Sequence, residues 1–503
     1  MIRIRKILLL TGYSVLLLLF SCTKNYQQLN ENPNAVSVAA PERLLNPALY
    51  AMVQMNVSRS WQINNQLAQV FVPLNDQIEI HRYIIRPDLS DPIWKAWYLE
   101  KTNFLDMYNI AAASHSATTG QSEPYMAIAN ILDAWASSLI TDTWGDVPYS
   151  QANKGKENQF TPVFDKQEDI YKGIFSKLEE ANTLLSGLVT AQLLTENQKG
   201  LDALYGSSAT NIIELDRWHK FGNSLYLRLL MRVSARTEAV IDGKTAAQKI
   251  GEMVASPATY PIFTSNAESA ILRLTGENYP LRSPFAGYRD VDFSRFGSLS
   301  EFFINTLSET GDPRLPLWAT KVDNEYQGIQ SGYEEGNIPA RGSTYVSALK
   351  LEPLLGNIMN YAELQFILAE AALKGYIPGD PKTYYEAGVK AGIEHWGLNM
   401  PANYLTSEGI KWEDSSTIDQ KMEQIMTQKY FTLFFTDFQQ WFEYRRTKRP
   451  TLPIGPDVKN DGIMPTRLYY PVAVQSLNRS NYLKAVARIG GDNLKAKVWW
   501  QVE

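Results

Sequence analysis

The sequence predicts an all-α protein in which pairs of helices form a tetratricopeptide-like scaffold, with long irregular segments between some of the pairs. Three observations predict this class. Apolar residues recur at steps of three and four, one region has the length of a tetratricopeptide hairpin, and two aromatic stretches contain too many Gly and Pro residues for regular helix.

Helical periodicity is clear in three segments, residues 128–139, 170–181 and 364–371. In the first of them, apolar side chains fall at positions 128, 131, 132, 135 and 139, which lie on one face of a helix. The spacing therefore predicts amphipathic helices. Two further pairs of helices are expected: 94–113 with 125–139, and 167–185 with 218–235.

Residues 361–396 form the clearest expected hairpin. The segment AELQFILAEAALKG precedes a Pro- and Gly-containing turn at 378–381, and TYYEAGVKAGIEHWG follows it. Small residues are present where the two helices are expected to meet, namely Ala371, Ala387 and Ala391. This length and composition fit a tetratricopeptide repeat.

Two long stretches, residues 275–297 and 326–345, lie outside this helical pattern and are rich in aromatic and Gly residues. They predict loops. Ordered loops of this length usually have a function, so we expect the ligand site there.

Composition excludes several classes of protein. The 503 residues carry 48 Lys+Arg and 53 Asp+Glu, a net charge of −5, without the basic stripe that nucleic acid requires. Apolar residues at 45% and charged residues at 20% exclude a disordered or collagen-like chain. The 27 Tyr and 12 Trp residues supply flat rings with polar tips, which suit ligand contact.

The first 22 residues have the layout of a secretory signal. Arg3, Arg5 and Lys6 precede an apolar run, and the small Ser21 ends it directly before Cys22. An N-terminal membrane helix is the alternative, although Gly, Tyr and Ser residues interrupt the run. Cys22 is the single cysteine of the chain, so an exported protein would depend on its core for stability rather than on disulfides.

The stretch 19–22, Leu-Phe-Ser-Cys, resembles a bacterial lipobox, with Phe20 in place of the usual small residue. The resemblance implies cleavage before Cys22 and acylation of this cysteine, which would hold the protein on a membrane. A chance free cysteine is the alternative. Removal of residues 1–21, which carry three positive charges and no negative ones, would change the net charge from −5 to −8. The expected organisation is a lipoprotein signal peptide at 1–21, a lipidated cysteine and polar tether at 22–40, and a helical domain at 41–503.

No recognisable catalytic constellation occurs in the sequence. A serine-hydrolase elbow, a Walker loop and a Gly-x-Gly-x-x-Gly turn are all missing. The histidines have no spacing typical of a zinc helix; they are His81, His115, His219 and His395. The acids Asp142, Asp146, Asp290 and Asp292 lack EF-hand spacing and are interpreted as capping or solvated groups. No metal or cofactor is expected, and a glycosidase pair among the many carboxylates remains an open alternative.

Several segments together resemble one family. They are NENPN after Cys22, LITDTWGDVPYSQAN at 139–153, FDKQEDIYKGIFSKLEEAN at 164–182, RWHKFGNSLYLRLLMR at 217–232, GDPRLPLWA at 311–319, YAELQFILAEAALKG at 361–375, FFTDFQQWFEYRRTKRP at 434–450, MPTRLYYP at 464–471 and the final VWWQ. In this order they resemble the SusD/RagB family of nutrient-binding lipoproteins, specifically its SusD-like branch. The resemblance covers nearly the whole chain.

The resemblance implies a tetratricopeptide-type scaffold on which loop-rich segments pack and carry the ligand site. It also implies an externally facing, lipid-anchored place on the outer membrane of a Bacteroidetes-type bacterium. The implied partner is a SusC-like TonB-dependent transporter, to which the protein delivers an oligosaccharide or an oligopeptide without breaking a bond. A surface-anchored glycosidase or peptidase, and a structural transporter lid with no ligand site of its own, are the alternatives.

Most of the motif residues are interpreted as structural. Residues 144–149 predict a tight turn in which Gly145 takes a positive φ and Asp146 bonds its own backbone. Arginines on two predicted helices are expected to pair with acids such as Glu370 or Glu443 and to organise helix packing. They are Arg228, Arg232, Arg445 and Arg446.

Ligand contact is expected from aromatic and polar residues in or beside the irregular segments. Aromatic rings stack on the apolar face of a sugar, and polar side chains bond its hydroxyl groups. The candidates are Tyr83, Trp94, Tyr279, Arg282, Tyr288, Phe293 and Tyr333.

Overall fold

The computed structural model describes residues 40–115, 122–188, 190–192, 202–206, 212–294 and 296–502. The chain divides into two units, Met1–Ala40 and Pro41–Glu503, and the fold below is that of the second. The predicted signal peptide, Cys22 and the tether up to residue 39 lie outside the described residues.

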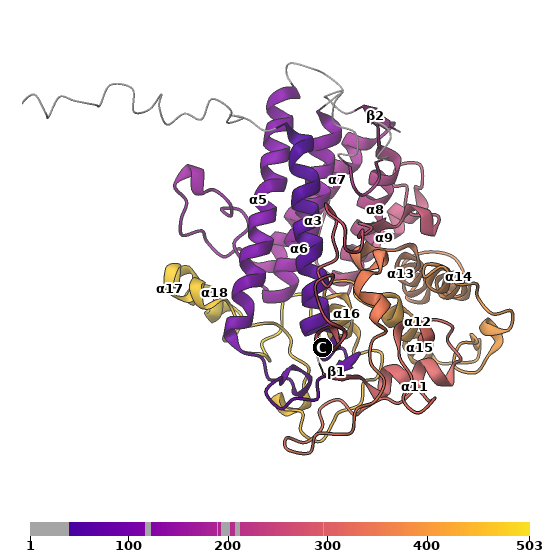
Figure 1. Cartoon of the computed structure of the whole chain (residues 1–503). Helices are drawn as coiled ribbons and strands as arrows, with labels where there is room; N and C mark the ends of the chain where they lie inside the picture. Colours follow the sequence, from indigo (N-terminus) through magenta and orange to yellow (C-terminus); the bar gives the residue numbers. More distant parts are fainter. Residues whose placement is uncertain are drawn as a thin grey trace, which may run out of the picture. The chain divides into compact units, whose positions relative to one another are not determined.

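Five long helices form the first part of the unit, and each packs against the next in chain order. Figure 1 shows several of them side by side, in indigo to magenta. They are α3 (Pro41–Arg59), α5 (Ser90–His115), α6 (Glu123–Trp144), α7 (Gln167–Leu185) and α8 (Leu215–Val233). The contacts of α5 with α6 and of α7 with α8 confirm both predicted pairs.

Helix α6 lies at the centre of these helices. It contacts α5, α7 and α8, and nearly all of its residues are buried. The pattern predicted that only one face of residues 128–139 is buried, and this prediction is wrong. Small and hydroxyl residues such as Ala134 and Ser138 are buried on the remaining faces of the helix.

The predicted hairpin is confirmed as α13 (Tyr361–Leu373) and α14 (Pro381–Glu394), and α13 also packs on α15 (Ile418–Thr432). The close approach of the two hairpin helices is at Gly388, where a Cβ would lie 2.8 Å from the ring of Phe366. Of the small residues expected at this contact, Ala371 and Ala391 are buried, whereas Ala387 is only partly buried.

The remaining α-helices are short. They are α4 (Asn65–Leu67), α9 (Ala246–Ala255), α10 (Asp290–Phe293), α11 (Glu301–Glu309), α12 (Leu315–Trp318), α16 (Gln439–Thr447), α17 (Val472–Leu477) and α18 (Arg479–Arg488). A π-helical turn, Ser60–Asn64, links α3 to α4. Short 3₁₀ turns occur at Ile80–Arg82, Pro87–Leu89, Gly155–Glu157, Asn266–Glu268, Ser347–Leu351, Pro353–Gly356, Tyr404–Thr406 and Asn460–Gly462.

Strands in the described ranges form three small antiparallel pairs. The pairs are β1 (Phe71–Val72) with β5 (Ser298–Leu299), β2 (Thr190–Gln192) with β3 (Ile212–Glu214), and β4 (Ala270–Ile271) with β6 (Asn357–Met359). In the first pair Phe71 is opposite Leu299. Leu299 also donates its backbone N–H to the Ser343 carbonyl at 2.7 Å. The strand that directly follows the first predicted loop segment therefore joins β1 to the second segment.

The turn after α6 has the predicted Gly145 with φ +84°, which an L side chain rarely adopts. The local bond predicted for Asp146 is wrong. Its Oδ1 accepts the Gln167 N–H at 3.0 Å and its Oδ2 accepts Arg488 Nε at 2.7 Å, because this carboxylate joins the first turn of α7 to α18.

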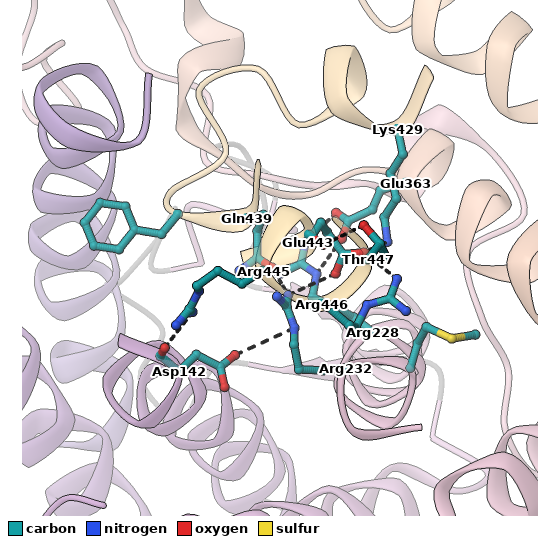
Figure 2. Close-up of polar contacts among 12 residues, drawn as sticks. Asp142, Arg228, Arg232, Glu363, Lys429, Gln439, Glu443, Arg445, Arg446 and Thr447 are labelled. Carbon is teal, nitrogen blue, oxygen red and sulfur yellow. Dashed lines mark hydrogen bonds and ion pairs between the residues drawn. The ribbon is translucent and has the colours of Figure 1, made fainter. Parts of the chain in front are cut away.

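Three of the four motif arginines pair with acids inside the helical core (Figure 2). Arg446 donates to Glu370 at 2.6 Å and to Glu443 at 2.7 Å, and Arg232 lies 3.3 Å from Glu443. These ion pairs join α8, α13 and α16, which confirms the predicted role in helix packing. Arg228 pairs with a different acid, Glu363, through a bond of 2.7 Å from its Nε.

For Arg445 the predicted acid partner is wrong. Its guanidinium donates to the backbone carbonyls of Thr466 and Asp142, the second at 2.6 Å, and lies 4.1 Å from the ring centroid of Trp441. Carbonyl oxygens and aromatic faces stabilise a buried guanidinium here in place of a carboxylate.

A pH-dependent effect on stability is expected at Asp437. Burial raises the pKa of this carboxyl to about 7, although Arg228 lowers it in part. The unfolded chain holds this proton only below about pH 4. The folded state therefore binds more protons between pH 4 and 7, and the contribution of Asp437 to stability falls as the pH rises through this range.

We expect Asp437→Asn to raise the free energy of unfolding by about 2 kcal/mol more at pH 8 than at pH 5, because the folded carboxyl is protonated at pH 5 and charged at pH 8, whereas the unfolded one is charged at both. Urea titrations of both proteins at the two pH values would check this. Equal differences between the proteins at pH 5 and pH 8 would contradict it.

Candidate ligand-binding site

Three of the seven predicted ligand residues are buried. Tyr83, Phe293 and Tyr333 are 4%, 1% and 4% exposed. The Tyr333 hydroxyl donates to the Pro73 carbonyl at 3.0 Å, and the ring of Phe293 stacks with that of Trp61 at a centroid distance of 6.3 Å. These rings anchor the loops and present too little surface for a sugar to stack on.

Tyr279 and Arg282, by contrast, are on the surface of the loop between β4 and α10. The Tyr279 side chain is 78% exposed, and the guanidinium carbon of Arg282 lies 5.7 Å from its ring centroid. Arg282 has no ion pair within the described part of the chain, so its N–H groups are available as donors.

Helix α3 positions this loop. Tyr50 on α3 donates its hydroxyl proton to the Arg282 carbonyl at 2.8 Å, and Gln54, one turn later, donates to Tyr50. Burial raises the pKa of Tyr50, with a further contribution from Tyr279, so the hydroxyl stays protonated and continues to donate at neutral pH.

Tyr288 provides a second ring on the same loop. It is 39% exposed and makes edge contacts with Trp61 at 5.7 Å and Phe285 at 5.8 Å between centroids. Arg282 Nη2 lies 3.7 Å from the position of a Cβ on the neighbouring Gly287, so the guanidinium is close to the backbone beside Tyr288. We call the surface formed by Tyr279, Arg282 and Tyr288 the Tyr279 face.

Two cavities lie near predicted residues: one of about 590 Å³ at Trp94 and one of about 560 Å³ beside Pro280 and Leu281. The second adjoins the Tyr279 face and has the size of a small-molecule site. Its lining residues are Asn46, Pro47, Tyr50, Asp202, Ala203, Gly206, Pro280 and Leu281. The Tyr279 face therefore combines exposed rings, an unpaired guanidinium and an adjacent hollow.

Trp94, the remaining predicted residue, lies apart from these groups in the 590 Å³ groove between α5 and α17. Its ring contacts Tyr98 at 4.7 Å and Trp144 at 5.1 Å between centroids. The other rings of this groove, Phe160 and Phe164, were not among the predicted ligand residues, although their place in a Pro-containing loop was a usable signal.

The described residues contain no group of three or more His, Cys, Asp or Glu side chains able to hold a metal ion. Burial lowers the pKa of His81 to about 3, and its Nδ1 accepts the Gly332 N–H at 3.1 Å. This histidine is neutral at physiological pH and holds a loop in place. In the same part of the chain, every helix is too short or too polar to cross a membrane.

A scaffold of helical pairs with ordered aromatic loops defines a helical binding protein. The chain belongs to the SusD-like family, described as starch-binding and associating with the outer membrane, whose model matches residues 33–471. This confirms the resemblance recognised from the motifs.

Solved structures confirm the fold. A SusD homologue from Bacteroides fragilis has 22% identity and a TM-score of 0.75, and the alignment covers 92% of this chain and 100% of that one. A chitin-binding SusD homologue from Flavobacterium johnsoniae has 20% identity and a TM-score of 0.75, with 92% and 99% covered. Another chitin-binding protein has 24% identity, a TM-score of 0.75, and 92% and 100% covered. A search of curated proteins gives no match.

Proposed function

We propose that this protein binds an oligosaccharide at the outer membrane, without cleaving it, and that the Tyr279 face is the binding surface. The observation that carries the proposal is the exposed Tyr279 ring beside the unpaired guanidinium of Arg282. A sugar ring would stack on Tyr279 or Tyr288, and Arg282 would donate to its hydroxyl oxygens.

Membership of a family described as starch-binding supports a saccharide ligand, as do two structural relatives that are named as chitin-binding. We propose further that the bound nutrient passes to a SusC-like TonB-dependent transporter. In this proposal, lipid attached to Cys22 holds the protein on the external face of the outer membrane.

We expect Tyr279→Ala to weaken oligosaccharide binding about two- to tenfold, because a stacked aromatic ring contributes about 0.5 to 1.5 kcal/mol beyond the area that it buries. Arg282→Gln should weaken it about fivefold through the loss of charge-assisted hydrogen bonds. Calorimetric titration with maltoheptaose and chitopentaose measures both. The matched control is Phe160→Ala, which removes another exposed ring, 74% accessible, from the separate groove.

Other outcomes of this titration would favour the alternatives. New products in the recovered samples would indicate a glycosidase or peptidase. Binding heat with oligopeptides but not with saccharides would contradict a saccharide ligand. Unchanged affinity in the Tyr279 and Arg282 variants would contradict the Tyr279 face as the binding surface. No binding of either class, with transport intact in the cell, would favour a structural lid.

The anchor has its own test. Cys22→Ala is expected to release the protein from the membrane fraction, because acyl chains supply roughly 0.8 kcal/mol per buried methylene. Fractionation of cells followed by immunoblotting measures this, with Ser21→Ala as the control that keeps the cysteine. Equal membrane retention of both variants would contradict lipid anchoring.

A further inference from the structure

The groove at Trp94 is separate from the Tyr279 face. It lies between α5, the loop after α6 and α17, and Ala473 N–H donates to Asp91 Oδ1 at 3.2 Å, which ties α17 to α5. Its volume of about 590 Å³ is that of a small-molecule site.

The walls of this groove are mainly apolar. Leu99, Phe160 and Leu477 line it and remain 57%, 74% and 77% exposed. Trp94 and Phe164 form its aromatic floor, with ring centroids 6.3 Å apart. Large apolar side chains that gather at one place on a surface mark a binding site more often than isolated ones do.

The polar side chains of the groove are used by the protein itself. Asn153 Nδ2 donates to the Tyr98 carbonyl at 2.7 Å and to Thr102 Oγ1 at 2.6 Å, while its Oδ1 is shielded from solvent and accepts no hydrogen bond within the described residues. The Tyr98 hydroxyl donates to the Pro148 carbonyl at 2.7 Å, and Asn478 Nδ2 donates to the Pro162 carbonyl at 2.7 Å. Few donors or acceptors remain for the hydroxyl groups of a sugar. Burying these hydroxyl groups in the groove without hydrogen-bond partners would be unfavourable.

One charged group at the rim remains available. Lys95 is exposed and has no ion pair or hydrogen bond within the described ranges. Asp91, one helical turn earlier, also lines the groove and keeps its negative charge, although its Oδ1 is fixed by the Ala473 N–H of α17. An apolar groove with a single unpaired cation at its rim is complementary to an apolar chain that ends in an anion.

We propose that this groove binds an amphiphile with one aliphatic chain and an anionic head. The chain lies along Trp94, Phe160 and Leu477, and the head group pairs with Lys95. The site is independent of the saccharide proposal, since no residue is shared between the groove and the Tyr279 face.

The test uses the full chain carrying Cys22→Ala, so that no attached acyl group competes, and terminally brominated dodecanoate as the probe. Saturable quenching of tryptophan fluorescence is expected, and Trp94→Phe should reduce the quenching while calorimetry still detects binding. Leu477→Asp should weaken binding about tenfold, because the contact of one leucine side chain is lost. Lys95→Gln should weaken dodecanoate binding about two- to fivefold and leave dodecanol binding unchanged.

Leu483→Asp is the matched control, because this leucine on α18 is 47% exposed but does not line the groove. The proposal is overturned by the absence of saturable quenching, by equal affinities in the Leu477 and Leu483 variants, or by displacement of dodecanoate with maltoheptaose or chitopentaose. The last result would assign the groove to saccharides.

Discussion

Replacing Arg228 with Met is expected to lower the free energy of unfolding by about 3 to 5 kcal/mol, because it leaves a buried carboxylate without its counter-charge. Arg228 and Glu363 are each 1% exposed, and the guanidinium Nε donates to the carboxylate at 2.7 Å. The same guanidinium donates to the Ile358 carbonyl at 2.8 Å, so the variant also leaves this acceptor unpaired. Urea-induced unfolding at pH 7 measures the change.

A double variant separates the loss of the pair from a general packing defect. Arg228→Met with Glu363→Leu removes both members of the pair, and we expect at least half of the lost stability to return, since apolar replacement of a whole buried pair is often close to neutral. Lys411→Met, which removes one member of an exposed pair with Glu413, is the control and should leave the unfolding midpoint unchanged. A double variant no more stable than Arg228→Met alone would contradict this explanation.

Gly356→Ala is expected to destabilise the fold by about 3 kcal/mol, the upper part of the range for overpacked sites. A Cβ at this position would lie 1.9 Å from the Leu272 carbonyl oxygen, which is backbone and cannot rotate away. The Leu272 N–H donates to the Gly356 carbonyl at 2.9 Å, so movement of either segment would also break the bond that continues the β4–β6 pair. Thermal unfolding followed by circular dichroism measures the loss.

Gly155→Ala is the matched control, because a Cβ there has no atom within 4 Å. We expect its melting temperature to equal that of the unmodified protein. A similar loss in both variants would contradict a cost that arises from the contact with Leu272, because the reduced freedom of the unfolded chain by itself stabilises an alanine variant.

The helical scaffold was predictable from the sequence because burial imposes a period on apolar residues. The hairpin of α13 and α14 and the neighbours α5 and α6 have this period, and the structure confirms them. The partners of the arginines were predictable only in part. A buried guanidinium needs acceptors, but Arg445 finds carbonyl oxygens while Arg446 finds carboxylates, and the choice depends on segments distant in the sequence.

The candidate ligand-binding site was also predictable from the sequence only in part. Tyr279 and Phe293 belong to one aromatic loop and looked equivalent as ligand residues, yet one is 78% exposed and the other 1%. The difference arises because Trp61, from the π-helical turn that follows α3, covers Phe293 and donates its indole N–H to the Phe293 carbonyl at 2.9 Å.

The sequence by itself determined the helical class, the family and the loops that carry the exposed rings, because periodicity, turn residues and ordered motifs are local properties of the chain. Only the tertiary structure decided which rings face solvent, which charges are paired, and that α17 lies beside α5 to form the second groove. These properties depend on contacts between segments far apart in the sequence, and local residue patterns do not specify such contacts.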